Sequence, residues 1–347
     1  MSGGVDSSVA AWLMMKSGFE CTGAMMKLFS NEDTGLEPDN SCCSQSHAED
    51  ARAVAFQLGM PFYVFNFAES FTRQVIDRFV DAYQCGVTPN PCIDCNRYLK
   101  FGRFLRRAHE MSCDCIATGH YARIEPCAGR YLLKKGVDAE KDQSYVLYMM
   151  TQEQLQHTLF PLGEMTKPEV REIALEQGLP NAEKPESQDI CFVPNGEYAA
   201  FIERYSENPP KKGLFVDLNN KVLGEHRGIH HYTIGQRRGL GLPDVEPRYV
   251  CSICHEDNTI VVGSRQDLYA TTLLAKNINL IPVERLDAPM RVWAKIRYRQ
   301  TAQPATVWQL DADTLRVEFD NPQSAITKGQ AVVLYDDDLV VGGGTIS

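Results

Sequence analysis

Helix-like and strand-like segments alternate through the first two hundred residues, and this alternation limits the possible folds more than any other feature. Helix-like apolar periods end at glycines such as Gly18, Gly59 and Gly178, which are typical C-terminal stops. We expect helices at 9–17, 48–58, 69–85, 96–110 and 166–177, and strands at 21–29, 61–67 and 113–118. Asn96 is a favourable N-cap for the fourth helix. This pattern predicts an α/β fold, a doubly wound parallel sheet with helices on both faces.

The pattern changes after about Tyr205. The segment 206–213 is rich in Pro and Lys and predicts a linker or a domain edge. Short strands follow, separated by turn signals such as Asn219-Asn220 and Asp257-Asn258. We therefore expect an α/β domain at residues 1–205, a small central β domain at 206–270, and a barrel or sandwich at 271–347.

The 347 residues carry a formal net charge of −10, which argues against unspecific binding to a polyanion. Two stretches differ from this average: 97–107 has five basic residues and no acid, and 291–299 reads RVWAKIRYR. Each is either a local nucleic-acid-binding face or an ordinary solvated face. No apolar run reaches the length of a membrane helix and no signal peptide is visible, so we expect a cytoplasmic protein with no membrane partner. Twelve cysteines fit metal or redox roles in the cytosol better than a secreted scaffold.

The chain opens with a glycine-containing loop, Ser2-Gly3-Gly4-Val5-Asp6-Ser7-Ser8, directly before the first predicted helix. It lacks the Lys of a Walker loop, but two glycines still let the backbone approach an anion closely, and the helix adds its free N–H groups. A carboxylate here, Asp6, makes sense if it helps to hold Mg²⁺ beside phosphate. The alternative is a chance glycine turn. The stretch resembles the PP-loop of ATP pyrophosphatases, which activate a carbonyl oxygen with AMP and release pyrophosphate.

Two cysteines, Cys92 and Cys95, stand just before the helix predicted at 96–110. A helix N-terminus and nearby basic residues favour the thiolate, so Cys95 is the candidate reactive thiol. Alternatives are a zinc knuckle with Cys251-x-x-Cys254 and an iron–sulfur cluster. The apparent strand around Cys251 would point these two side chains to opposite faces, which disfavours the knuckle. We expect no structural metal.

A third cysteine, Cys191 in SQDICF, is by itself most simply a buried thiol. Beside Cys95 it acquires a second interpretation, because sulfur transfer needs one thiol to carry a persulfide and another to resolve it as a disulfide.

The chain as a whole resembles the family of tRNA-specific 2-thiouridylases. The segments SGGVDSS, TPNPCIDCN, ATGHYAR, KDQSYVLY, SQDICF, GIHHYTIGQRRGLGLP and KIRYRQ appear in the family's order and cover essentially its full length. The resemblance implies a nucleotide-binding α/β domain, a small central β domain and a C-terminal β-barrel.

The resemblance also implies roles for single residues. ATP would contact Ser2 to Ser7, Met26 and Gly119; core packing is the alternative role of Met26. The segment Asn90-Pro91-Cys92 would meet the target base, although many relatives carry an acidic residue where Cys92 stands. His120 would touch the tRNA, unless it is a satisfied core histidine. The other implied tRNA contacts are Lys141, Asp142, Gln143, Arg297, Tyr298 and Gln330.

The implied reaction uses ATP and Mg²⁺ to transfer AMP to O2 of the wobble uridine, with release of pyrophosphate. A persulfide on Cys191 then supplies sulfur to C2. Cys95 acts as nucleophile or resolving thiol, and a transient Cys95–Cys191 disulfide forms. The partners would be tRNAs for lysine, glutamate and glutamine, and an upstream sulfur donor such as a cysteine desulfurase or a sulfur-relay protein. Cys42, Cys43, Cys113 and Cys115 are interpreted as packing thiols.

Family members carry a short hydrophobic strand just before the residues that match Met1-Ser2-Gly3-Gly4. We expect a strand of the parallel sheet to be missing from the sequence as written, which would leave two strand edges unpaired and destabilise the chain.

Overall fold

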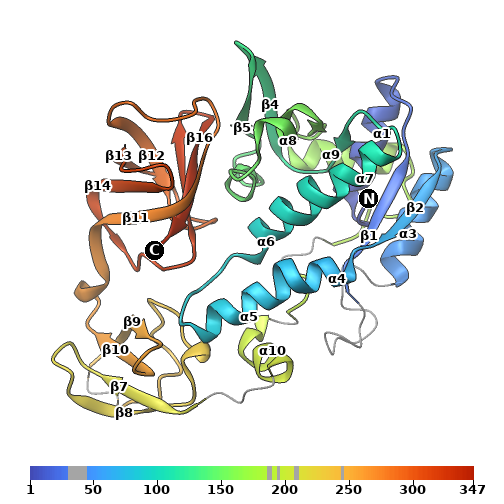
Figure 1. Cartoon of the computed structure of the whole chain (residues 1–347). Coiled ribbons are helices and arrows are strands. Elements are labelled where there is room, and N and C mark those ends of the chain that lie inside the picture. The colour runs from blue at the N-terminus through green and yellow to red at the C-terminus, as the bar shows by residue number, and fades with distance from the viewer. Residues whose placement is uncertain (30–44, 186–189, 194–195, 207–210, 244–245) are drawn as a thin grey trace. The chain divides into compact units, whose positions relative to one another are not determined.

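The computed structural model describes residues 1–29, 45–185, 190–193, 196–206, 211–243 and 246–347 (Figure 1). The chain divides into two compact units. Unit 1 contains Met1–Ile76, Pro91–Gly196 and Asp338–Val340, and unit 2 contains Asp77–Asn90, Glu197–Asp337 and Val341–Ser347.

Unit 1 contains the predicted alternation of helices and parallel strands. Helix α1 (Val5–Lys16) begins directly after the opening loop, and α3 (Gln45–Gln57) packs on the parallel pair β1 (Gly23–Lys27) and β2 (Phe62–Asn66). A second parallel pair joins β3 (Ile116–Ala117) to β6 (Thr158–Leu159). Within the described residues, the single parallel sheet that the sequence predicts is therefore present as two separate pairs.

Several helices have interruptions or starts that the sequence pattern did not predict. The segment predicted as one helix at 69–85 consists of α4 (Ala68–Phe71), a π-helical segment (Thr72–Ile76) and α5 (Asp77–Gln84). The next helix begins at α6 (Pro91–Asp94), continues as the π-helical η2 (Cys95–Phe104) and ends with α7 (Leu105–Glu110).

Asn96 is therefore not the N-cap of this helix, as predicted, but an interior residue. Its side chain is buried and its Nδ2 donates to the Val146 carbonyl at 3.0 Å. The physical reason for the earlier start is Pro91, whose fixed φ and missing N–H suit a first helical position. Cys92 and Cys95 thus lie within the helix rather than just before it.

The remainder of unit 1 includes a hairpin and two capped helices. β4 (Ala122–Cys127) pairs with β5 (Arg130–Lys135), and α8 (Gln152–Gln156) begins with a capping box. α9 (Lys167–Glu176) begins at the predicted place, because Thr166 and Glu169 form a second capping box.

Unit 2 contains a small sheet with its own core. After α10 (Tyr198–Tyr205), the strands β7 (Gly213–Val216), β8 (Val222–His226), β9 (Tyr249–Cys254) and β10 (Thr259–Gly263) form a sheet in the order β8–β7–β10–β9. Asn220 and Asn258 have φ values of 63° and 48°, so both predicted turns are confirmed.

The last strands of the chain form a closed barrel, so the barrel alternative is confirmed over the sandwich. The order is β11–β14–β13–β12–β15–β16, and pairing of β11 with β16 closes it. Inward residues such as Ala294, Val307 and Leu315 are fully buried. The strands are β11 (Tyr269–Leu280), β12 (Met290–Lys295), β13 (Gln303–Gln309), β14 (Thr314–Ser324), β15 (Ala331–Asp336) and β16 (Leu339–Ile346).

Candidate functional site

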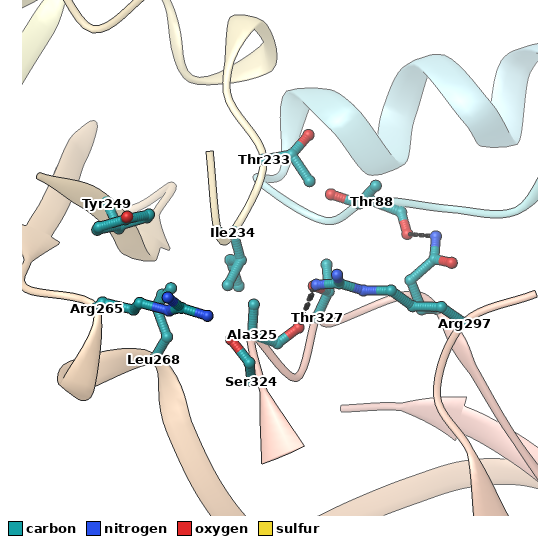
Figure 2. Close-up of a pocket in the computed structure, with 12 residues that line it drawn as sticks. Thr88, Thr233, Ile234, Tyr249, Arg265, Leu268, Arg297, Ser324, Ala325 and Thr327 are labelled. Atoms are coloured by element: carbon teal, nitrogen blue, oxygen red, sulfur yellow. Dashed lines mark hydrogen bonds between the residues drawn. The ribbon is translucent and has the colours of Figure 1, made fainter. Parts of the chain in front are cut away.

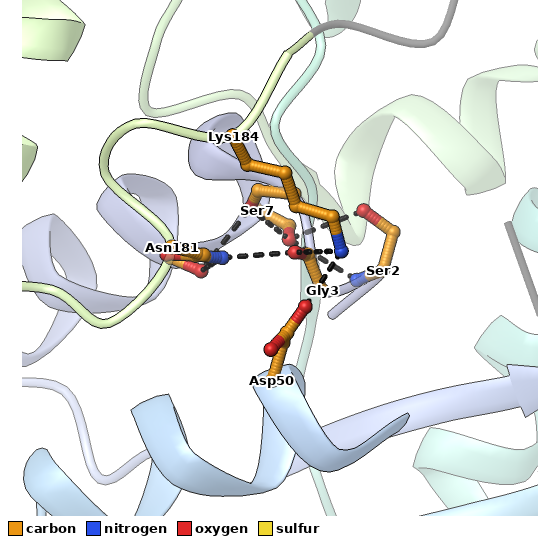
Figure 3. Close-up of polar contacts among 8 residues, drawn as sticks. Ser2, Gly3, Ser7, Asp50, Asn181 and Lys184 are labelled. Carbon is orange, nitrogen blue, oxygen red and sulfur yellow. Dashed lines mark hydrogen bonds and ion pairs between the residues drawn. The ribbon is translucent and has the colours of Figure 1, made fainter. Parts of the chain in front are cut away.

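The opening loop folds back on the first turn of α1 (Figure 3). The Ser2 N–H donates to Ser7 Oγ at 3.1 Å, and Ser7 Oγ donates to the Gly4 carbonyl at 2.9 Å. Gly4 is the N-cap residue, and no side chain caps the helix there. The free N–H groups and the positive end of the helix dipole are thus available to an anion.

Two glycines allow the backbone to pack closely around this loop. Gly3 has a φ of 73°, and a Cβ at this position would lie 2.4 Å from the His47 carbonyl oxygen. A Cβ on Gly119 would lie 2.8 Å from the Asp6 carbonyl carbon and 2.9 Å from the Ser7 nitrogen. The structure therefore places Gly119 directly against the loop, and neither position has room for a side chain.

The loop lies close to the carboxyl ends of parallel strands, where open α/β folds bind their ligands. Gly119 follows β3 by two residues, and Met26 is the half-buried penultimate residue of β1, paired with Phe65. A group of the kind expected here, a nucleotide, fits these residues, because the loop is a backbone cradle that any side chain would fill.

Asp6 has two partners that the sequence analysis missed. Lys167 Nζ lies 2.6 Å from Asp6 Oδ1, and the Tyr121 hydroxyl donates to the same oxygen at 2.9 Å. The Lys167 side chain is only 8% exposed, so its ammonium depends on Asp6 for its charge partner. Tyr121 stands in the motif ATGHYAR and Lys167 at the start of α9, but nothing in the local pattern shows that they meet Asp6.

A second polar group supports Gly3 from the segment after α9 (Figure 3). Asn181 Nδ2 donates to the Gly3 carbonyl and to Ser8 Oγ, both at 2.9 Å. Lys184 Nζ pairs with Asp50 at 2.6 Å and reaches the Gly3 carbonyl at 3.4 Å. These contacts fix the loop and place a further ammonium beside it.

The candidate catalytic cysteines lie on two segments of unit 1. Cys92 is exposed and Cys95 is partly buried at the start of η2, which packs against α4. Cys191 is partly buried, and its neighbour Phe192 contacts Phe71 of α4 at a centroid distance of 5.6 Å. The segments that carry Cys95 and Cys191 therefore border the same helix. Ser187 to Asp189 of the SQDICF motif, and Cys42 and Cys43, lie outside the described residues.

The alternative metal sites built on cysteine find no support in the part of the chain that the structure describes. There, no set of three potential ligand atoms lying within 4.8 Å of one another includes a cysteine. Cys251 and Cys254 lie on β9 as predicted, and burial raises the pKa of the Cys251 thiol.

His120 is buried and both of its ring nitrogens have partners. Its Nδ1 lies 2.7 Å from Thr118 Oγ1 and its Nε2 lies 3.4 Å from Lys100 Nζ. Since an ammonium can only donate, Nε2 accepts and Nδ1–H donates to Thr118. Burial, and next the Lys100 charge, lower the pKa of His120 well below its ordinary value. The predicted tRNA contact at His120 stays a prediction, made by a neutral and largely enclosed ring.

The predicted contact segment 141–143 is a loop held by its own side chains. Asp142 accepts hydrogen bonds from the backbone N–H groups of Gly136 and Ser144 at 3.2 and 3.1 Å. Gln143 Oε1 accepts at 3.0 Å from the backbone N–H of Tyr121, the residue whose hydroxyl contacts Asp6. Asp142 and Gln143 thus have structural roles, and their contact with tRNA stays a prediction.

Unit 2 contains a cavity of about 520 Å³, and both Arg297 and Gln330 line it (Figure 2). Arg297 donates to the Ala325 carbonyl at 2.7 Å, and Gln330 Nε2 donates to the Thr88 carbonyl at 2.9 Å. A second cation, Arg265, lines the same cavity, and none of its lining residues is acidic. Tyr298 is exposed beside Arg297. The lining favours an anionic ligand.

These features define a nucleotide-binding α/β protein with two appended β domains. Three family models match the chain: the tRNA methyl transferase HUP domain at residues 1–195, the tRNA methyl transferase PRC-barrel domain at 199–264, and the aminomethyltransferase beta-barrel domain at 270–346. The chain belongs to the family of tRNA-specific 2-thiouridylases.

Relatives that carry this name align with all of the chain. The tRNA-specific 2-thiouridylase MnmA of Clostridioides difficile is 51% identical, over 100% of this chain and 96% of its own length. The protein of the same name from Clostridium acetobutylicum is 48% identical over 100% and 98%, and that from Acetivibrio thermocellus is 50% identical over 100% and 97%. No helix in the described residues combines the length and apolar character needed to cross a membrane.

Proposed function

We propose that this protein is an ATP-dependent tRNA 2-thiouridylase that replaces O2 of the wobble uridine with sulfur. The observation that carries the proposal is the full-length similarity, 51% with the C. difficile relative, to proteins of this name. The opening loop, bordered by Gly3 and Gly119, supplies the nucleotide cradle that such an activation needs.

In the first step, the loop from Ser2 to Ser7 would bind the ATP phosphates through its backbone and hydroxyl groups. Oxygen O2 of the uridine attacks the α-phosphorus, and pyrophosphate leaves. Asp6 would hold Mg²⁺ through the carboxylate oxygen that Lys167 and Tyr121 do not occupy. The ion would supply positive charge to the polyphosphate. Lys167 and Lys184 place two ammonium groups near the loop, paired with Asp6 and Asp50 respectively.

In the second step, the terminal sulfur of a Cys191 persulfide attacks C2, and AMP leaves. The Cys95 thiolate then attacks Cys191 Sγ, which breaks the S–S bond, leaves sulfur on C2 and forms a Cys95–Cys191 disulfide. An external dithiol returns both cysteines to thiols before the next turnover. Their placement on segments that border the same helix, α4, supports this pairing. An upstream donor, such as a cysteine desulfurase or a sulfur-relay protein, would load Cys191.

The tRNA would be bound through local contacts, since the net charge of −10 opposes binding over the whole surface. We propose that Asn90-Pro91-Cys92 meets the target base, and that His120, 141–143, Arg297, Tyr298 and Gln330 contact the tRNA. A wobble base in a loop can be turned into a pocket at low cost, and aromatic rings can stack on it. The reaction would take place in the cytoplasm, on tRNAs for lysine, glutamate and glutamine.

The test is a thiolation assay with the purified chain, ATP, Mg²⁺, a persulfide source and an unmodified tRNA that has a wobble uridine. We expect 2-thiouridine, AMP and pyrophosphate in equal amounts. Cys95→Ser and Cys191→Ser should abolish thiolation but leave adenylation, measured as exchange of labelled pyrophosphate into ATP. Cys254→Ser, on β9, is the matched control and should keep full activity.

Two outcomes would contradict the proposal. Full thiolation by either catalytic variant would exclude the two-cysteine mechanism. Pyrophosphate exchange that depends on a small amine acceptor and not on tRNA would instead indicate a PP-loop synthetase that forms an amide or amidine.

A further inference from the structure

Two adjacent histidines and a glutamate, none of which has been assigned a role above, converge in unit 2. Glu203 lies in the last turn of α10, and His230 and His231 end the short 3₁₀ helix η5 (Ile229–His231). His231 Nε2 lies 2.9 Å from Glu203 Oε1, and His230 Nε2 lies 3.6 Å from the same oxygen. Among the described residues, this is the one set of three His, Cys, Asp or Glu ligand atoms that lie within 4.8 Å of one another.

Glu203 Oε1 lies within hydrogen-bond distance of His231 Nε2, whereas His230 Nε2 lies farther from it, within ion-pair distance only. The His230 side chain is only 5% exposed, and its buried Nε2 has no hydrogen-bond partner within 3.5 Å among the residues that the structure describes. The distance of 3.6 Å to Glu203 exceeds that of a normal hydrogen bond. A buried polar atom without a partner costs about 1–3 kcal/mol, so a nitrogen held in this position needs a reason.

The chemistry and spacing of the three groups suit a transition metal. Imidazole nitrogen and carboxylate oxygen are zinc ligands at about 2.0–2.2 Å, which places neighbouring ligand atoms about 3.4 Å apart in a tetrahedron. The distance of 3.6 Å between His230 Nε2 and Glu203 Oε1 is already close to this value. The distance of 2.9 Å between His231 Nε2 and Glu203 Oε1 would increase by about 0.5 Å on metal binding.

The surrounding residues orient the group. Tyr198 is the first residue of α10, the helix that also carries Glu203. Its hydroxyl donates to the His231 carbonyl at 3.4 Å. His226, the next histidine along the chain, is engaged elsewhere: its Nδ1 accepts from the Gly228 N–H, so its Nε2–H donates to the Asn258 carbonyl at 3.1 Å. Glu203 is 40% exposed, which leaves a path for an ion and a water molecule.

We propose that Glu203, His230 and His231 form a zinc site, with water as the fourth ligand. The ion would join α10 to η5. Thr233 to Gly235, which begin two residues after the end of η5, line the cavity that contains Arg297 (Figure 2). Zinc would therefore fix one wall of that cavity.

The test is zinc binding by the full chain after removal of metal with a chelator, measured by competition with a chelating dye under reducing conditions. We expect one equivalent of zinc bound by Glu203, His230 and His231. His231→Gln and Glu203→Gln should each weaken zinc binding at least about 100-fold, since loss of an outer partner alone typically costs 10- to 100-fold. His255→Gln and Glu256→Gln, an exposed His–Glu pair in the turn after β9, are matched controls and should bind zinc as the parent does.

A second measurement separates this site from the cysteines and from a folding defect. Cobalt in the parent protein should show tetrahedral ligand-field bands without a thiolate charge-transfer band. Zinc should also raise the melting temperature of the parent and of the control variants, and not that of His231→Gln. Equal zinc affinity in parent and His231→Gln, a thiolate band, or no zinc binding by the parent would each overturn the proposal.

Discussion

Because Gly119 has no side chain, its backbone can lie directly against the backbone of Asp6 and Ser7 in the opening loop. In Gly119→Ala, the new Cβ would meet Asp6 and Ser7 backbone atoms at 2.8–2.9 Å. We expect a loss of about 1–3 kcal/mol in the free energy of unfolding, and ATP affinity at least about 10-fold weaker because the loop shifts. Chemical denaturation and binding of a fluorescent ATP analogue measure the two effects.

Gly4→Ala is the informative companion to this variant. Gly4 has an extended backbone conformation, and its new Cβ would meet only Ser2 Oγ, at 3.5 Å. The unfolding free energy should stay within about 0.5 kcal/mol of the parent, so any loss of ATP affinity reports on the nucleotide itself. Unchanged stability and ATP affinity in Gly119→Ala would show that the close approach at position 119 does not matter.

His120 gives the second prediction at this scale, a dependence of stability on pH. Its pKa is lowered in the folded state by burial and by Lys100, so the unfolded chain binds more protons below about pH 6.5. The contribution of neutral His120 is complete above that pH and is lost as the pH falls toward the folded pKa, by at most about 1.4 kcal/mol per pH unit. His120→Gln should therefore show a shallower decline of unfolding free energy from pH 7.5 to 5.5. The unfolding free energy at each pH is measured by urea denaturation. If it changed equally with pH in the parent and in His120→Gln, this role of His120 would be excluded. His255→Gln, at an exposed histidine, is the control.

At the scale of elements, the barrel holds the segment that precedes the candidate base contact. Gln330 Nε2 donates to the Thr88 and Pro89 carbonyls at 2.9 and 3.3 Å, and the Thr88 N–H donates to the Lys328 carbonyl at 3.0 Å. With about 1 kcal/mol for each of the two lost hydrogen bonds, Gln330→Ala should speed amide exchange of Thr88 by about 5- to 30-fold, the lower value applying if only one of them matters. Gln309→Ala, which removes the acceptor of the Leu286 N–H, should leave Thr88 exchange unchanged. Unchanged exchange in Gln330→Ala would show that backbone pairing alone fixes this segment.

The sequence predicted elements better than it predicted contacts between them. Glycine stops and the Thr166 capping box are local, and they placed helix ends within a few residues. A proline is permitted both in a turn and at a first helical position, so the local pattern does not show that the helix begins at Pro91 rather than at Asn96. The partners of Asp6, Tyr121 and Lys167, are more than a hundred positions away along the chain. Local patterns hold no information about such long-range contacts.

At the scale of the whole molecule, an acidic chain has to bind an acidic polymer through few contacts. The basic stretch 291–299 contains two arginines that look equivalent in the sequence. In the structure, Arg291 forms a bidentate pair with Asp320 at 2.7–2.8 Å, whereas the partners of Arg297 are the neutral groups of Ala325 and Thr327. No carboxylate among these partners neutralises the Arg297 guanidinium, so its charge is available to bind a phosphate. Arg265 lines the same cavity.

The salt dependence of tRNA affinity tests this distinction between the two arginines. Each phosphate contact contributes about 0.7–0.9 to the slope of log K against log salt concentration. Arg297→Gln should weaken tRNA binding at low salt and lower the slope by that amount, measured by filter binding between 50 and 200 mM salt. Arg291→Gln should change neither quantity, because the Asp320 carboxylate already neutralises that charge. If both variants reduced the slope equally, the internal ion pair would not protect Arg291 from use by the tRNA, and the binding surface would extend along β12 rather than stay within the cavity.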